Sequence, residues 1–199
     1  MKLYWSPASP YARKVRATAR EKGLADRIEE VTVETSQDPA GLIAANPLGK
    51  VPALALDDGT TLFDSPVICA WLDAQGDGPA LVPAAGPDRY RVLRAEALAD
   101  GIMDLAVGLI MERRKPEDER SPTTAARWRG QLSRALDAVP GEVAVLPEDL
   151  TLGHLALAVA LAYVEFRHPD IAWRDGRPEL TTWFEALATR PSLAETAPQ

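Results

Sequence analysis

A valine followed by a proline, at positions 51 and 52, is the first feature of this chain that could do chemistry. Proline has no backbone N–H, so Pro52 removes one donor that a sheet would use and leaves the N–H and C=O of Val51 open to a partner. A Val-Pro peptide bond is also one of the few that can be cis. The pair is therefore expected to present its backbone to a ligand.

A carboxylate and a hydroxyl, those of Asp64 and Ser65, stand directly before Pro66. Proline is favoured at the first position of a helix, so both side chains are expected at a positively polarised helix start. Together with the Val51-Pro52 backbone, this segment is expected to attract the amine and carboxylate ends of a small peptide.

Alternating strand-like and helix-like segments must position these residues. We expect strands at 2–6, 28–33, 53–56 and 61–63, and helices at 10–22, 39–45 and 66–74. Ser9 would cap the first helix and Gly23 would end it. A strand, a helix and a strand at this spacing predict a right-handed crossover between parallel strands, and Asp57–Thr60 predicts a hairpin turn.

Only helices are expected after the turn-rich segment 76–79. Their expected ranges are 88–113, a helix capped by Ser121, 151–166 and 178–189. The third is apolar nearly all round, which places it at the centre of its domain. The charged run 112–120 is expected to be a solvated connection, and Pro191-Ser192 to end the last helix.

Composition excludes several classes of protein. The chain has 199 residues, 46% of them hydrophobic, a net charge of −7, one cysteine and two histidines. The negative charge argues against a nucleic-acid surface, and the few cysteines and histidines argue against an internal disulfide or a metal site. No apolar run approaches the roughly 20 residues of a membrane span, and no secretory signal is evident. A cytoplasmic protein is expected.

Five stretches carry a resemblance to a known family: 6–16, 46–54, 64–66, 97–104 (Ala-Leu-Ala-Asp-Gly-Ile-Met-Asp) and 183–192. They resemble the glutathione S-transferase family over nearly the whole chain, and its small bacterial members most. The resemblance implies an α/β plus all-α protein. A thioredoxin-like N-terminal domain would span 1–76, a linker 77–87 and an all-helical bundle 88–199.

The same resemblance implies a glutathione site. Family members hold the cysteinyl backbone of glutathione on the valine before the cis proline, which Val51 and Pro52 match. They hold the γ-glutamyl end with an acidic residue and a serine at a helix start, which Asp64 and Ser65 match. Lys50 would reach the glycyl carboxylate.

A hydroxyl or thiol near the end of the first strand activates the glutathione sulfur in the family. Ser9 is the best match, both as the catalytic residue and as a contact of glutathione, with Ser6, Tyr4 and Tyr11 as alternatives. A serine cannot form a mixed disulfide, and the apolar context of Cys69 predicts that this thiol is buried. Disulfide exchange by the protein itself is therefore not expected.

The implied function is attack of enzyme-bound glutathione, the co-substrate, on a small apolar electrophile, with no metal. The alternatives are a glutathione-dependent isomerase or dehalogenase, or a non-catalytic glutathione-binding adaptor. The resemblance further implies a homodimer and a role in detoxification.

The start of the central helix departs from the family. Thr151 is followed three residues later by His154, where members usually carry Asp. We expect the reciprocal bond of the capping box to be weakened or lost, so His154→Asp would stabilise the protein by several tenths of a kcal/mol.

Overall fold

A four-stranded mixed sheet forms the centre of the first part of the chain. The structure, a computed structural model, describes residues 1–198. Strand β1 (Lys2–Trp5) pairs in parallel with β2 (Glu29–Thr32) and antiparallel with β3 (Ala53–Ala55), and β4 (Thr61–Leu62) pairs antiparallel with β3. The strand order is β2-β1-β3-β4, which confirms the predicted parallel crossover followed by a hairpin.

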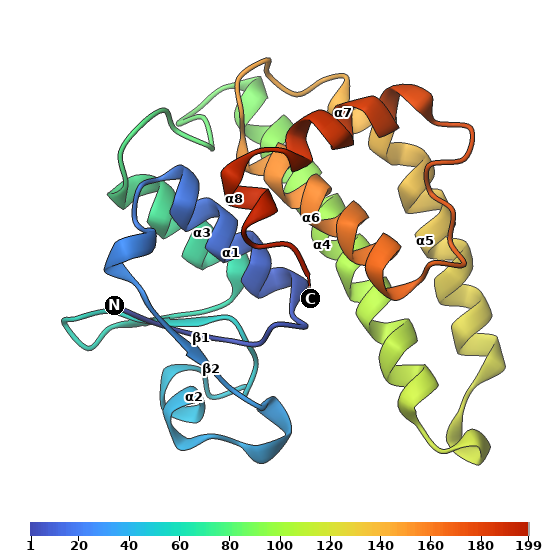
Figure 1. Ribbon diagram of the computed structural model, residues 1–199, viewed down its shortest axis with the longest axis horizontal. Helices are drawn as coiled ribbons and strands as arrows, with labels where there is room; N and C mark the ends of the chain where they lie inside the picture. The colour runs from blue at the N-terminus through green and yellow to red at the C-terminus, as the bar shows by residue number, and fades with distance from the viewer. Residues whose placement is uncertain (199) are drawn as a thin grey trace. The chain divides into compact units, whose positions relative to one another are not determined.

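Three helices accompany this sheet: α1 (Pro10–Glu21), α2 (Ala40–Ala45) and α3 (Ser65–Gln75). Helices α1 and α3 pack against each other on one side of the sheet, and α2 lies on the other side (Figure 1). Single turns of 3-10 helix, η1 (Ala25–Arg27) and η2 (Thr35–Gln37), flank β2. This is the thioredoxin-like arrangement that the resemblance implied.

Helix α1 begins and ends where its sequence predicts. The Ser9 hydroxyl oxygen accepts a hydrogen bond from the Ala12 N–H at 3.1 Å, and Pro10 occupies the first helical position. Gly23 lies just past the end with φ of +65°, a conformation that favours glycine, and the next N–H returns to the carbonyl of Ala19 at 2.8 Å.

The helical part consists of four long helices: α4 (Pro87–Arg114), α5 (Pro122–Val143), α6 (Leu152–Arg167) and α7 (Pro178–Ala188). Helix α6 packs against α4 and α7, and α4 also packs against α5. Every residue from Leu152 to Leu161 is buried, as the apolar composition of α6 predicts.

Two local predictions were incomplete. Residues 113–120 are exposed, as expected of a solvated connection, but the side chain of Glu112 is buried and accepts hydrogen bonds from the Ser121 N–H at 2.6 Å and from Lys115 at 2.7 Å. Pro191 does not only end a helix, because a further short helix, α8 (Pro191–Ala194), starts there. Proline is compatible with the first position of a helix, so it marks a start as readily as a stop.

The chain divides into two compact units, one of Met1–Ala84 with the described residues after Thr189, and one of Ala85–Thr189. The expected boundaries, 1–76, 77–87 and 88–199, differ from this division. Residues 77–84 are tied to the first unit by a bond from the buried Lys22 to the carbonyl of Pro79, and by bonds from the N–H groups of Leu81 and Val82 to Asp73. Within residues 1–198, no helix combines the length and the apolar character needed to cross a membrane.

Candidate functional site

Three segments with candidate residues meet at one end of the sheet. Strands β1 and β3 are antiparallel and pair Tyr4 with Ala53, so the end of β1 lies beside the start of β3. Strand β4 runs antiparallel to β3 and pairs Leu62 with Leu54, so the end of β4 reaches the same place. The chain therefore brings the segments that follow β1, precede β3 and follow β4 to a common edge.

A buried asparagine shapes the segment before β3. Asn46 donates its side-chain amide to the carbonyl of Lys50 at 2.8 Å and accepts the Leu48 N–H on its side-chain oxygen at 3.0 Å. Its own carbonyl accepts the N–H of Gly49, which has φ of +62°, at 2.9 Å. These three bonds hold the loop that delivers Val51. Asn46 belongs to the 46–54 motif, although no local sequence pattern assigns it this role.

The Val51–Pro52 peptide bond is cis, the isomer that the sequence permitted. The side chain of Val51 packs against a core cluster that includes Leu42 and Ala53. Its backbone N–H and C=O make no hydrogen bond with any residue that the structure describes. Lys50 is exposed beside it. The backbone of Val51 is therefore available to a ligand that adds as a short strand.

Asp64 and Ser65 lie at the start of α3, which begins one residue earlier than expected, at Ser65. Asp64 occupies the position of a helix cap, yet its side chain makes no capping bond. It is exposed and, among residues 1–198, pairs with no cation. Ser65 is 2% exposed. A carboxylate placed at a helix start without capping it is free to bind an ammonium group.

Ser9 lies at the N-terminus of α1, where its oxygen is occupied as the cap and its hydroxyl hydrogen remains a donor. Its backbone N–H bonds to the carbonyl of Ser6 at 3.0 Å. Tyr4 packs against the core cluster of Leu42, Ala45 and Ala53. Its hydroxyl lies close to Gly41, 3.0 Å from the position that a Cβ atom on this glycine would take. This packing argues against Tyr4 as the catalytic hydroxyl, whereas Ser6 and Tyr11 remain alternatives.

A cavity of about 90 Å³ opens beside Ser9, and we call it the arginine hollow. It is lined by Trp5, Pro7, Ser9, Arg13, Arg16, Glu195, Thr196 and Ala197. Apart from Ser9, sequence reasoning missed these residues as site residues. The available signal was Arg13, which follows Ser9 by four residues and so lies on the same face of α1.

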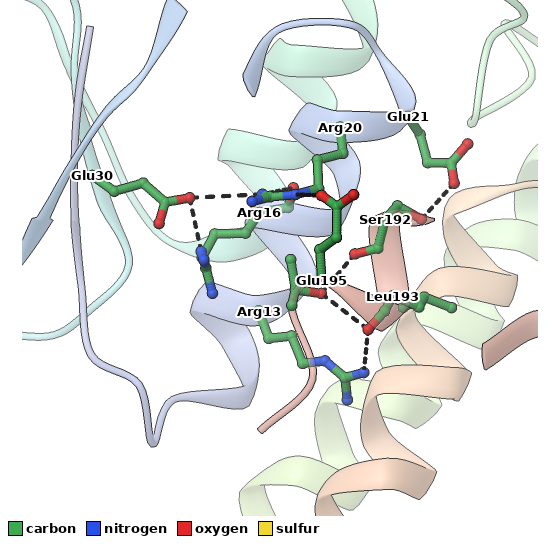
Figure 2. Close-up of polar contacts among 9 residues, drawn as sticks. Arg13, Arg16, Arg20, Glu21, Glu30, Ser192, Leu193 and Glu195 are labelled. Carbon is green, nitrogen blue, oxygen red and sulfur yellow. Dashed lines mark hydrogen bonds and ion pairs between the residues drawn. The ribbon is translucent and has the colours of Figure 1, made fainter. Parts of the chain in front are cut away.

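Arg13 is the central cation of the arginine hollow. One terminal nitrogen donates to the carbonyl of Leu193 at 3.0 Å (Figure 2). Burial and then the charge of Arg16 lower the Arg13 pKa to about 10, so the side chain stays protonated at neutral pH. Arg16 stacks over the ring of Trp5, 3.9 Å from its centroid, and bonds to Glu30 at 2.8 Å.

Cys69 is fully buried in α3, as its sequence context predicted, and accepts a hydrogen bond from the Thr18 hydroxyl at 3.4 Å. A thiol enclosed in this way is not exposed to substrates. Across the part of the chain that the structure describes, no three His, Cys, Asp or Glu side chains form a group that could hold a metal ion.

Two family models match the chain. Residues 8–75 match the glutathione S-transferase N-terminal domain, and residues 122–186 match the glutathione S-transferase C-terminal domain. Each match falls within one of the two compact units.

Individual relatives cover the whole chain. The uncharacterized GST-like protein YibF of Escherichia coli K12 is 34% identical over 100% of this chain and 98% of its own length, which confirms the expected bacterial subgroup. A glutathione transferase family member of Pseudomonas fluorescens Pf-5, solved with bound glutathione, is 36% identical, with a TM-score of 0.93 and coverage of 100% and 98% of the two chains. A second structure from that organism contains S-(propanoic acid)-glutathione, with 37% identity, a TM-score of 0.90 and full coverage of both chains.

Proposed function

This chain belongs to the glutathione S-transferase family, and on that premise we propose that it binds glutathione in its first unit and transfers the thiolate to a small electrophile. The observation that carries the proposal is the pairing of two unsatisfied groups at one edge of the sheet. These are the backbone of Val51 and the carboxylate of Asp64. The backbone of Val51 can pair with the backbone of a short peptide, and the carboxylate of Asp64 can pair with its ammonium group.

In this proposal the backbone of Val51 pairs with the cysteinyl residue of glutathione. Asp64 binds the γ-glutamyl ammonium, and the start of α3 at Ser65 takes the adjacent carboxylate. Lys50, which is exposed, reaches the glycyl carboxylate. Two bound structures of relatives support the choice of ligand, since both contain glutathione or a conjugate of it.

Ser9 activates the sulfur in this scheme. Its free hydroxyl hydrogen and the N-terminus of α1 both favour a thiolate. A thiol with a pKa of about 8.5 is roughly 3% ionised at neutral pH, and a drop of about two units raises this about twentyfold. About tenfold of that gain is lost again if nucleophilicity falls with basicity as in disulfide exchange. Most of the acceleration must therefore come from positioning the electrophile.

Isothermal titration with glutathione tests the binding step. We expect the wild type to bind and Asp64→Asn to lose at least about tenfold in affinity, because a charge-assisted bond to the ligand ammonium is removed. Asp26→Asn is the matched control, since Asp26 is an exposed carboxylate elsewhere in the same unit. Absence of binding by the wild type would eliminate transferase, isomerase and dehalogenase activities alike.

We also propose a cytoplasmic homodimer active in detoxification, as the family resemblance implies. Light scattering of the purified protein tests the assembly, and a mass of a single chain at micromolar concentration would contradict it.

A further inference from the structure

We propose that the arginine hollow binds a carboxylate on the second substrate, so that the favoured electrophiles are α,β-unsaturated carboxylates. This inference rests on the proposed function, because Ser9, which would face the glutathione sulfur, also lines the hollow. It goes further by naming the chemical class of the acceptor.

The first argument is an excess of hydrogen-bond donors. The Nε1 of Trp5 and the Nε and Nη1 of Arg13 are buried without a partner among the described residues. Both side chains line the hollow, and all three atoms are donors. Three of the six buried side-chain atoms without a partner among the described residues belong to these two side chains, and buried donors without partners destabilise a protein. A carboxylate accepts hydrogen bonds on both oxygens and donates none, which is what these groups need.

The second argument is charge. Arg16 bonds to Glu30, and Arg20 bonds to Glu195 at 3.2 Å (Figure 2). Arg13 has no carboxylate within ion-pair distance in the described part of the chain. Of the charged side chains that line the hollow, Arg16 and Glu195 each have a partner of opposite charge, whereas Arg13 has none among the described residues. On a chain with net charge −7, this is a local site for an anion.

The third argument is size. One water molecule needs at least about 10–15 Å³ of such space, so a cavity of about 90 Å³ has room for several waters. This volume suits a carboxylate with two or three carbons. With its carboxylate in the hollow, a short unsaturated acid extends toward Ser9, and its reactive carbon then lies near the glutathione sulfur.

The reaction itself is a conjugate addition. The thiol proton leaves to solvent, the sulfur forms a bond to the β-carbon, and the electron pair of the double bond moves to the α-carbon. That carbon takes a proton from water, which gives a carboxyethyl thioether with no change in redox state. Negative charge grows on the carboxylate in the transition state, where Arg13 stabilises it.

Binding of two glutathione conjugates tests the site. S-(2-carboxyethyl)glutathione carries the carboxylate and S-propylglutathione does not. By calorimetry we expect the wild type to prefer the carboxylate conjugate by about tenfold or more. Arg13→Gln should lose the preference and Arg13→Lys should keep part of it. Arg91→Gln is the control, since Arg91 bonds to Asp88 in the other compact unit, away from the hollow, and its loss should leave the preference unchanged.

Equal affinity of the wild type for both conjugates, or a preference that persists in Arg13→Gln, overturns the inference. If neither glutathione nor either conjugate binds, the proposed function fails. A test without glutathione then decides whether the arginine hollow binds a carboxylate. The ¹⁵Nε signal of Arg13, assigned by its absence in Arg13→Lys, should shift on addition of propanoate and not of propanamide. No shift with propanoate overturns the anion site by itself.

Discussion

Ser9 and Asp64 occupy similar positions in the sequence, but their side chains have different roles in the structure. Ser9 and Asp64 both precede a helix and both could have been plain caps. The structure shows that Ser9 caps α1 and that the Asp64 side chain does not cap α3. A site residue can therefore be a cap as well, as Ser9 is, whereas an acidic residue that leaves its own helix uncapped has its charge free for a ligand.

The double role of Ser9 gives a prediction. Ser9→Ala should lower the free energy of unfolding by about 1 kcal/mol, because a helix loses its cap. It should also lower turnover with glutathione while sparing glutathione affinity. Ser121→Ala is the matched control: Ser121 caps α5 through the Thr124 N–H at 3.2 Å and also precedes a proline.

Urea unfolding and steady-state kinetics of the two variants separate the roles. Similar losses of stability are expected in both, with loss of turnover in Ser9→Ala alone. Normal turnover in Ser9→Ala would move the catalytic assignment to Ser6 or Tyr11.

At the scale of elements, the start of α6 corrects a prediction. The reciprocal bond of the capping box is present, since the Thr151 N–H donates to the Nδ1 of His154 at 3.1 Å. Burial lowers the pKa of His154, so its ring is neutral and has a lone pair to accept with. The ring also lies 6.2 Å from that of Trp183, centroid to centroid. The expected gain from His154→Asp therefore no longer follows.

Acid should weaken the helical unit through its two histidines. Burial lowers the pKa of both His154 and His168, in the second case against an opposing hydrogen bond to the Ala106 carbonyl. Below about pH 6.5 the unfolded chain binds protons that the folded chain does not. The stability contributed by the neutral rings is therefore present above that pH and lost as the pH falls toward 5.

Thermal unfolding between pH 7.5 and 5 measures this effect. His154→Gln should flatten the dependence, because glutamine can accept the same Thr151 bond without titrating. Carboxylates with lowered pKa values, such as Glu21, titrate below this range. An unchanged slope in His154→Gln would remove His154 as a source of the pH dependence.

Elements were predictable where local chemistry decides them. Ser9 with Pro10 starts a helix and Gly23 ends one, because caps and positive φ act over a few residues. The burial of Glu112 depends on a partner nine residues away, and the role of His154 depends on its protonation state. The same division holds for the site. Val51 and Asp64 carry a local pattern, whereas the arginine hollow needs a C-terminal segment that no local pattern joins to α1.

At the scale of the whole molecule, that C-terminal segment completes the first unit. Arg190 donates two hydrogen bonds to Glu21, at 3.0 and 2.8 Å, across 169 positions of sequence. Ser192 bonds to the same carboxylate, and Arg20 bonds to Glu195 (Figure 2). These contacts carry the chain past the N-terminal part of α1, where Thr196 and Ala197 close one wall of the arginine hollow.

Glu21→Gln should therefore destabilise the first unit by about 1–3 kcal/mol, since charge-assisted bonds to a partly buried carboxylate are lost. Burial raises the pKa of Glu21, but the bonds from Arg190 and Ser192 outweigh it and the pKa is lowered. Glu29→Gln is the control, because its pair with Lys2 at 3.4 Å is exposed and contributes at most about 1 kcal/mol. Chemical unfolding measures the loss of stability in both variants. Equal losses would contradict the idea that the C-terminal segment stabilises the first unit through Glu21.

The contacts of residues 190–198 with α1 also limit the order in which the protein can fold during synthesis. Synthesis runs from the N-terminus, so Glu21 emerges from the ribosome long before Arg190, and the whole helical unit is made in between. The sheet and its helices can form early, but the wall of the arginine hollow cannot. The first unit to begin folding is thus the last to be finished, and a stalled chain would carry the Val51 and Asp64 groups without the Arg13 site complete.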